Sequence, residues 1–314
     1  MSILNKFFEG DQLALAKIIT HIENKGQQLP KLLPKLYAKA GHAYRIGFTG
    51  PPGAGKSTLV DKMAKSYIVS STIGIIAIDP SSPFTGGALL GDRIRMQNLT
   101  PYKDIFIRSM ATRGSSGGLA VSTGDVAMAM DAFGKDIVLI ETVGVGQVEL
   151  DIVDSCDTTV VVLVPESGDS VQALKAGLME IADIFVINKS DRPGADQMAI
   201  ELKMMLELKR TKSDWDYPVI STQALKDVGI DELKQTIARH REFLTLAENT
   251  EIYRRRKIKC DLKRILDMEL KNYLSEHLLS PDVLNNYIDK VINGKSNPYE
   301  ITMEIIKSLN KDKT

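Results

Sequence analysis

Cysteine is scarce in this chain, because only Cys156 and Cys260 occur among its 314 residues. They lie far apart and match no metal-binding or redox spacing, which excludes a disulfide framework and suits a reducing compartment. Net charge is also lacking, since 40 basic residues balance 40 acidic ones. The composition therefore gives no electrostatic reason to expect nucleic acid or an anionic membrane as a partner.

Long apolar runs are missing as well. No stretch approaches the roughly 18 uninterrupted apolar residues of a membrane-spanning helix. The first residues include Glu9 and Asp11 and lack the apolar core and small-residue cleavage site of a signal peptide. Their acidic content also differs from that of a transit peptide. We therefore expect a cytoplasmic protein.

What the chain does contain is an alternation of short apolar runs with helical patterns between residues 44 and 243. These runs are rich in β-branched residues and apolar on both faces, as in a parallel sheet covered by helices. They lie at Tyr44–Thr49, Ile73–Ile78, Ile105–Arg108, Ile137–Ile140, Thr159–Val164, Ile184–Ile187 and Val219–Ile220. The alternation predicts a doubly wound α/β domain with a mostly parallel sheet.

Helical patterns flank this domain, so we divide the chain into an N-terminal helical extension (1–43), a central domain (44–243) and a C-terminal helical region (244–314). Apolar side chains at helical spacing in residues 11–24 predict a brace packed on the core. A long helical pattern runs through residue 278, Pro281 ends it, and two shorter helices follow. Because three helices bury little apolar surface alone, we expect them to fold back on the central domain or to form a homodimer.

A glycine-rich segment stands directly after the first predicted strand. It fits G-x-x-x-x-G-K-[ST], the phosphate-binding loop, in the required context between a strand and a helix. Glycines let backbone N–H groups converge on phosphate oxygens, and the following helix points its positive end at them. We expect Lys56 to reach the β- and γ-phosphates and Ser57 to bind Mg²⁺. The predicted phosphate contacts are Gly50, Pro51, Gly53, Ala54, Gly55, Lys56, Ser57 and Thr58.

A base-reading segment follows a later strand, at Asn188-Lys189-Ser190-Asp191. An ionised Asp191 only accepts hydrogen bonds, and guanine offers paired donors at N1–H and the 2-amino group, whereas adenine does not. Asn188 faces the base with Asp191, and the Lys189 stem lies along the purine face. Ser221 and Gln223, after the last short strand, are candidates for a further contact to the guanine oxygen. The sequence therefore predicts a guanine nucleotide, GTP or GDP, as ligand.

Acidic residues for a metal stand where strands end. Asp79 and Glu141 each follow an apolar run, and Asp92 lies in a Leu-Gly-Asp-Arg string. Together with Ser57 they make a plausible Mg²⁺ shell, direct or through water. Any one of these acids alternatively caps a helix or turn.

We predict that the segment from Glu141 to Gln147 senses the γ-phosphate, because the Gly144 N–H can donate a hydrogen bond to the terminal phosphate and lose that bond after hydrolysis. Val145 stands where a Ras-like enzyme supplies a water-orienting glutamine, so we expect slow intrinsic turnover that a partner regulates. The candidate catalytic residues are Lys56, Asp92, Glu141 and Gly144. Three arginines are candidate charge stabilisers or structural ion-pair partners: Arg93, Arg108 and Arg113.

Several longer strings in this chain resemble one family, the MeaB/ArgK GTPases associated with methylmalonyl-CoA mutase, within the SIMIBI class of P-loop proteins. The similarity covers nearly the whole chain and is much more specific than the phosphate-loop motif alone. The strings that carry it lie at 49–59, 77–83, 87–96, 112–114, 141–149 and 168–177.

The resemblance implies a G-protein metallochaperone, a homodimer through its C-terminal helices, that binds an adenosylcobalamin-dependent acyl-CoA mutase. In that family GTP binding and hydrolysis gate the loading of intact cofactor and protect or reactivate the mutase. The stretch from Pro165 to Lys175 resembles the family's additional switch loop, with Gln172 and Lys175 as the residues expected to communicate with the mutase. The chain has no Asp-x-His-x-x-Gly motif, so we expect cobalamin to be bound by the mutase and not by this chain.

Three other classes remain open from the sequence. A transport-associated ATPase or kinase, the older label of ArgK-like sequences, needs adenine selectivity, which Asp191 opposes. A nickel-inserting GTPase needs clustered His and Cys, yet the four histidines are dispersed along the chain. A protein-targeting GTPase needs a methionine-rich helical module, whereas the twelve methionines here are scattered.

Overall fold

The computed structural model describes residues 2–26, 28–79, 99, 101–111, 116–144, 155–165, 178–208, 215–274 and 281–311. The chain forms two compact units, Met1–Cys260 and Asp261–Thr314. The three-part division expected from the sequence differs in its boundaries and stays a prediction. No helix within the described ranges is both long and apolar enough to cross a membrane.

The first unit is built on a seven-stranded sheet in the order β3-β2-β4-β1-β5-β6-β7, in which every pairing is parallel. Its strands are β1 (Tyr44–Thr49), β2 (Ile73–Asp79), β3 (Ile105–Ala111), β4 (Ile137–Glu141), β5 (Thr158–Leu163), β6 (Ile184–Asn188) and β7 (Val219–Thr222). The predicted parallel α/β sheet is confirmed, and all seven apolar runs are strands. A parallel sheet gathers the carboxyl ends of its strands at one edge, where ligands bind in this class of fold.

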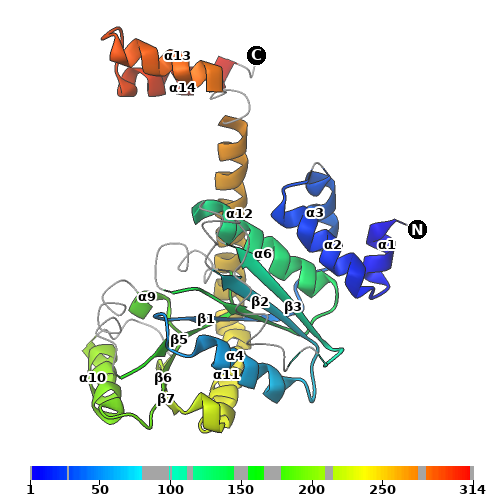
Figure 1. The fold of residues 1–314 in the computed structure, drawn as a ribbon, viewed down its shortest axis with the longest axis vertical. Helices are drawn as coiled ribbons and strands as arrows, with labels where there is room; N and C mark the ends of the chain where they lie inside the picture. Colours follow the sequence, from blue (N-terminus) through cyan, green and yellow to red (C-terminus); the bar gives the residue numbers. More distant parts are fainter. Residues whose placement is uncertain are drawn as a thin grey trace. The chain divides into compact units, whose positions relative to one another are not determined.

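Helices cover both faces of the sheet, which explains why its strands are apolar on both sides (Figure 1). One face packs against α4 (Lys56–Tyr67) and α11 (Ile230–Thr245). The other packs against α6 (Ser116–Ala132) and the N-terminal helices α1 (Ile3–Phe8), α2 (Gln12–Glu23) and α3 (Leu29–Tyr37). The predicted brace is α2, whose apolar stripe is fully buried: Leu15, Ile18, Ile19 and Ile22. A smaller cluster joins α9 (Met179–Ile181) and α10 (Ala195–Leu208) to β5 and β6.

The long C-terminal helix begins later than the sequence pattern suggested. Helix α11 ends when Leu246 turns to an extended ψ of 140°, and α12 then spans Ala247–Tyr273. The Asn249 side chain donates to the Phe243 carbonyl at 3.0 Å, so a polar side chain satisfies a backbone group freed at the break. Pro281 opens α13 (Pro281–Ile292), and α14 spans Pro298–Lys311 with Asn297 as its cap.

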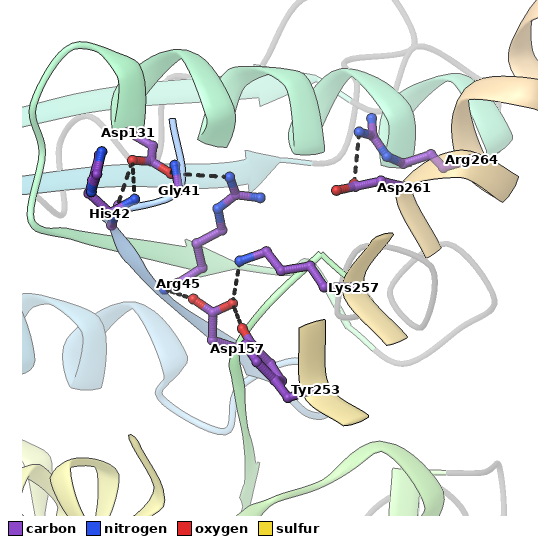
Figure 2. A network of polar contacts seen from close by, with 10 residues as sticks. Gly41, His42, Arg45, Asp131, Asp157, Tyr253, Lys257, Asp261 and Arg264 are labelled. Carbon is purple, nitrogen blue, oxygen red and sulfur yellow. Dashed lines mark hydrogen bonds and ion pairs between the residues drawn. The ribbon is translucent and has the colours of Figure 1, made fainter. Parts of the chain in front are cut away.

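A buried carboxylate, Asp157, holds α12 to the start of β5 (Figure 2). Its Oδ1 accepts hydrogen bonds from the Tyr253 hydroxyl and, at 2.7 Å, from Lys257 Nζ, both on α12. Its Oδ2 accepts from the Arg45 backbone N–H at 2.7 Å. Burial, and then the Asp157 charge, raises the pKa of the Tyr253 phenol, which therefore stays protonated and donates.

A second carboxylate extends this network (Figure 2). Asp131, at the end of α6, accepts from the backbone N–H groups of Gly41, His42 and Ala43 at 2.8 to 3.0 Å. The Arg45 side chain reaches the same carboxylate at 3.4 Å. The two carboxylates thus tie the segment between α3 and β1, the end of α6, and the starts of β1 and β5 to α12, at the amino ends of the strands.

We expect Asp157→Asn to lower the free energy of unfolding of the first unit by about 2 kcal/mol, because the partly buried Lys257 loses its charged hydrogen-bond partner. Tyr253→Phe removes one hydrogen bond to a charged group and costs about 1.5 kcal/mol. Urea denaturation followed by circular dichroism measures both. Tyr37→Phe, at an exposed phenol, is the matched control. Wild-type stability in both Asp157→Asn and Tyr253→Phe would contradict this role of the network.

Candidate nucleotide site

The glycine-rich loop lies between the end of β1 and the start of α4, at the carboxyl edge of the sheet (Figure 1). Gly55, the residue before α4, has φ 89°, a left-handed conformation that favours glycine. A Cβ built at this position would lie 2.4 Å from Asn188 Nδ2. The loop therefore needs glycine at this position for two reasons, its backbone conformation and the close approach of Asn188.

Lys56 is 5% exposed and sits between the loop and the end of β4. Its ammonium donates to the carbonyls of Gly50 at 2.8 Å, Pro51 at 3.1 Å and Val143 at 3.2 Å. A buried ammonium requires such partners. The geometry places a positive charge within the loop that the sequence assigns to phosphate.

The segment after β4 lies against the same loop. The Gly144 carbonyl accepts from Thr49 Oγ1 at 3.1 Å and from Thr142 Oγ1 at 3.3 Å. A Cβ added at Gly144 would approach the Pro52 ring to 3.8 Å. The structure therefore brings Gly144 next to the glycine-rich loop, as a phosphate sensor requires. Val145, Gly146 and Gln147 lie outside the described residues.

Two of the predicted metal ligands meet at this edge. Ser57 Oγ donates to Glu141 Oε1 at 2.6 Å. Glu141 ends β4, next to β2, whose last residue is Asp79. The Asp79 side chain and the whole of Asp92 lie outside the described part of the chain. Hydroxyl and carboxylate oxygens are the ligands that Mg²⁺ prefers, so the donors fit that ion. Among the described side chains, no group of three or more His, Cys, Asp and Glu is placed to hold a metal.

Asn188 connects the glycine-rich loop to the end of β7. Its Nδ2 donates to the Ala54 carbonyl at 2.9 Å, and its Oδ1 accepts from Thr222 Oγ1 at 3.1 Å and the Ala224 N–H at 3.2 Å. Asn188 is 3% exposed and Thr222 is fully buried. The sequence predicted only a base contact for Asn188. In the structure its amide fixes the glycine-rich loop, the phosphate loop (50–57), to the segment 188–191, the base loop, and to the end of β7.

The remaining base-loop residues lie nearer the surface. Lys189 has φ 56°, and its Nζ donates to the Gly53 carbonyl at 2.9 Å. Asp191 is partly exposed and accepts from Lys226 Nζ at 3.1 Å. Ser221 and Gln223 flank the buried Thr222 at the end of β7. The structure therefore places every described residue of the predicted base site in one region of the carboxyl edge.

The predicted charge-stabilising arginines fall into two groups. Arg108 on β3 pairs with Glu23 and donates to Thr20 Oγ1 at 3.2 Å, both on α2, so it has the structural role that the sequence left open. Arg93 and Arg113 lie outside the described residues, as do Gln172 and Lys175. The sequence pointed to residues 221–224 as a neighbour of the base, but it predicted neither the bond of Thr222 to Asn188 nor the contact of Lys226 with Asp191, since these residues carry no motif of their own.

The chain is similar to known proteins both in sequence and in structure. The family model described as "Methylmalonyl Co-A mutase-associated GTPase MeaB" matches residues 15–278. A Pyrococcus abyssi protein whose name places it among GTPases is 46% identical over 311 residues, which cover 98% of this chain and 96% of that protein. A solved structure titled as a LAO/AO transport system kinase is 26% identical, with a TM-score of 0.71 and coverage of 98% of this chain and 96% of the other.

A fusion protein is also similar. The "Fused isobutyryl-CoA mutase" of Cupriavidus metallidurans is 38% identical over 245 residues, which cover 74% of this chain but 22% of that protein. The region related to this chain is therefore a minor part of a longer polypeptide that bears a mutase name.

Proposed function

The chain belongs to the MeaB family of methylmalonyl-CoA mutase-associated GTPases, and from that membership we propose that it is a G-protein chaperone for an adenosylcobalamin-dependent acyl-CoA mutase. As a member of the family it is a GTPase. In the proposal, GTP binding and hydrolysis gate cofactor loading, protection or reactivation of the mutase. The proposal is carried by one relative, the "Fused isobutyryl-CoA mutase", which contains a region 38% identical to this chain. Covalent fusion keeps two cooperating proteins at high effective concentration, so such a fusion supports a mutase as the partner.

The nucleotide chemistry of the proposal rests on the contacts at the carboxyl edge. Lys56 supplies positive charge at the β- and γ-phosphates, and Gly144 is the sensor beside them. Ser57 and Glu141, with Asp79 and Asp92, would hold Mg²⁺, which would offset negative charge on the phosphates. Asp191 accepts hydrogen bonds from the two donors of guanine, and Asn188 keeps the base loop and phosphate loop at a fixed separation. Slow turnover follows from Val145, which cannot orient water.

A purified adenosylcobalamin-dependent acyl-CoA mutase tests the proposal directly. We expect it to co-elute with this chain in gel filtration to an extent that differs between GDP and a non-hydrolysable GTP analogue. At saturating mutase, the GTP turnover of the chain should rise. Corrinoid absorbance in the eluted complex reports whether cofactor accompanies the mutase.

The control is Lys56→Ala, which should lower turnover by about 10²-fold or more because it removes charge at the phosphates. This variant should also lose the nucleotide dependence of the complex. Unchanged turnover across saturating mutase, with no complex in any nucleotide state, would refute the chaperone function while leaving GTP hydrolysis intact.

We also propose that the C-terminal helices form the homodimer. Among the described residues of the second unit only Ile301 is buried, and apolar side chains at four-residue spacing on α12 are exposed: Leu262 by 64%, Leu266 by 58% and Leu270 by 48%. Burying such a stripe against a second copy removes apolar surface from water.

Light scattering of the free chain should therefore give twice the mass of one chain. Leu266→Glu should shift this mass toward that of one chain, since a charge then sits in the buried stripe. Val69→Glu, at an apolar residue of the first unit that is 88% exposed, is the control and should leave the dimer intact. A monomeric wild type would contradict the proposal.

A further inference from the structure

Residues 223–229, directly after β7, form a short, tightly closed turn next to the base loop. Gln223 and Val228 exchange two backbone hydrogen bonds, at 3.0 and 3.3 Å, around the 3-10 helix η3 (Ala224–Lys226). Gly229 closes the turn with φ 79°, and a Cβ there would lie 2.3 Å from the Ser221 carbonyl oxygen. The turn therefore has little freedom to change its conformation.

This turn holds the base loop at two points. At one end, the Ala224 N–H donates to Asn188 Oδ1 at 3.2 Å. At the other end, Lys226 Nζ donates to Asp191 Oδ2 at 3.1 Å. Between them, the Ser190 N–H donates to the Thr222 carbonyl at 3.0 Å. The segment 188–191 is thus fixed along its length by β7 and the turn after it.

We propose that Lys226 is a positioning residue for guanine recognition, fixing the Asp191 carboxylate so that it meets the two donors of the base. This inference rests on the proposed role of Asp191. A carboxylate has about four lone-pair sites on its two oxygens, so one bond from Lys226 leaves acceptors for both N1–H and the 2-amino group. The carboxylate would otherwise rotate about its last torsion, which is broad in Asp.

Stability alone does not account for this pair. The Lys226 side chain is 63% exposed and that of Asp191 is 45% exposed, and an ion pair in such a setting contributes little to folding. The hydrogen bond from Lys226 nevertheless holds the pKa of Asp191 below its ordinary value, and the Arg192 charge acts in the same direction. An exposed aspartate is ionised at neutral pH in any case, so what Lys226 adds is the position of the carboxylate and not its charge.

Calorimetric titration with GDP and with inosine diphosphate, both with Mg²⁺, tests the inference. Inosine lacks the 2-amino group, so the ratio of the two affinities measures how well Asp191 reads that group. We expect Lys226→Ala to reduce this ratio about three- to tenfold, since a hydrogen bond between charged groups contributes to placement on that scale. Lys226→Arg, which keeps the charge and the donor, should retain most of the ratio.

Two further variants separate positioning from a general structural role. Lys62→Ala removes the 2.8 Å ion pair between α4 and Asp227, the next residue of the turn, and should leave the ratio at its wild-type value. In an Asp191→Asn background, Lys226→Ala should reduce the ratio no further, because the group it acts through has been changed.

A wild-type or increased affinity ratio in Lys226→Ala would overturn the inference. A wild-type ratio includes the case in which the affinities for GDP and inosine diphosphate fall by the same factor. Failure of the proposed base site and failure of the Lys226 role give different results. If Asp191→Asn itself leaves GDP affinity unchanged, the proposed base site is wrong and the role of Lys226 fails with it. If Asp191→Asn weakens GDP binding but Lys226→Ala leaves the ratio intact, only the role of Lys226 is lost.

Discussion

The proposed nucleotide site depends on the buried amide of Asn188. Its donor engages the Ala54 carbonyl of the phosphate loop, and its acceptor engages Thr222 and the turn after β7. A buried amide left without these partners costs free energy, so the two loops are held at one separation. Gly55 makes the contact possible, because any side chain there would occupy the space of the Asn188 amide. Binding a phosphate chain and a purine at once requires such a fixed separation.

The opposite edge of the same sheet carries a second buried network, centred on Asp157 and Asp131. The sheet between them is packed on both faces by apolar clusters. Close-packed interiors transmit strain and do not deform continuously. The first unit therefore presents the loops that we assign to the nucleotide at one end of a rigid sheet and secures the start of α12 at the other.

Much of this architecture could be predicted from the sequence, because its signals are local. Short apolar runs, which cover both faces of the central strands, predicted the sheet, and the glycine-rich loop stood in a recognisable strand-to-helix context. Contacts between residues distant in the sequence could not be predicted. Examples are Thr222 with Asn188 and Arg108 with Glu23, since a pairing of ordinary polar residues follows from the fold and not from spacing. The boundary expected after residue 243 lies three residues before the break at Leu246, whose exact position is set by backbone and side-chain bonds that carry no sequence motif.

The central claim is that Asp191 selects a purine carrying an exocyclic amine, which makes GTP the ligand of the site. The most direct test is a calorimetric titration of the unmodified chain with non-hydrolysable analogues of GTP and ATP in the presence of Mg²⁺. The account predicts that the guanine nucleotide binds at least about 10²-fold more tightly, because adenine leaves the carboxylate without a donor. Equal affinity for the two analogues would contradict it.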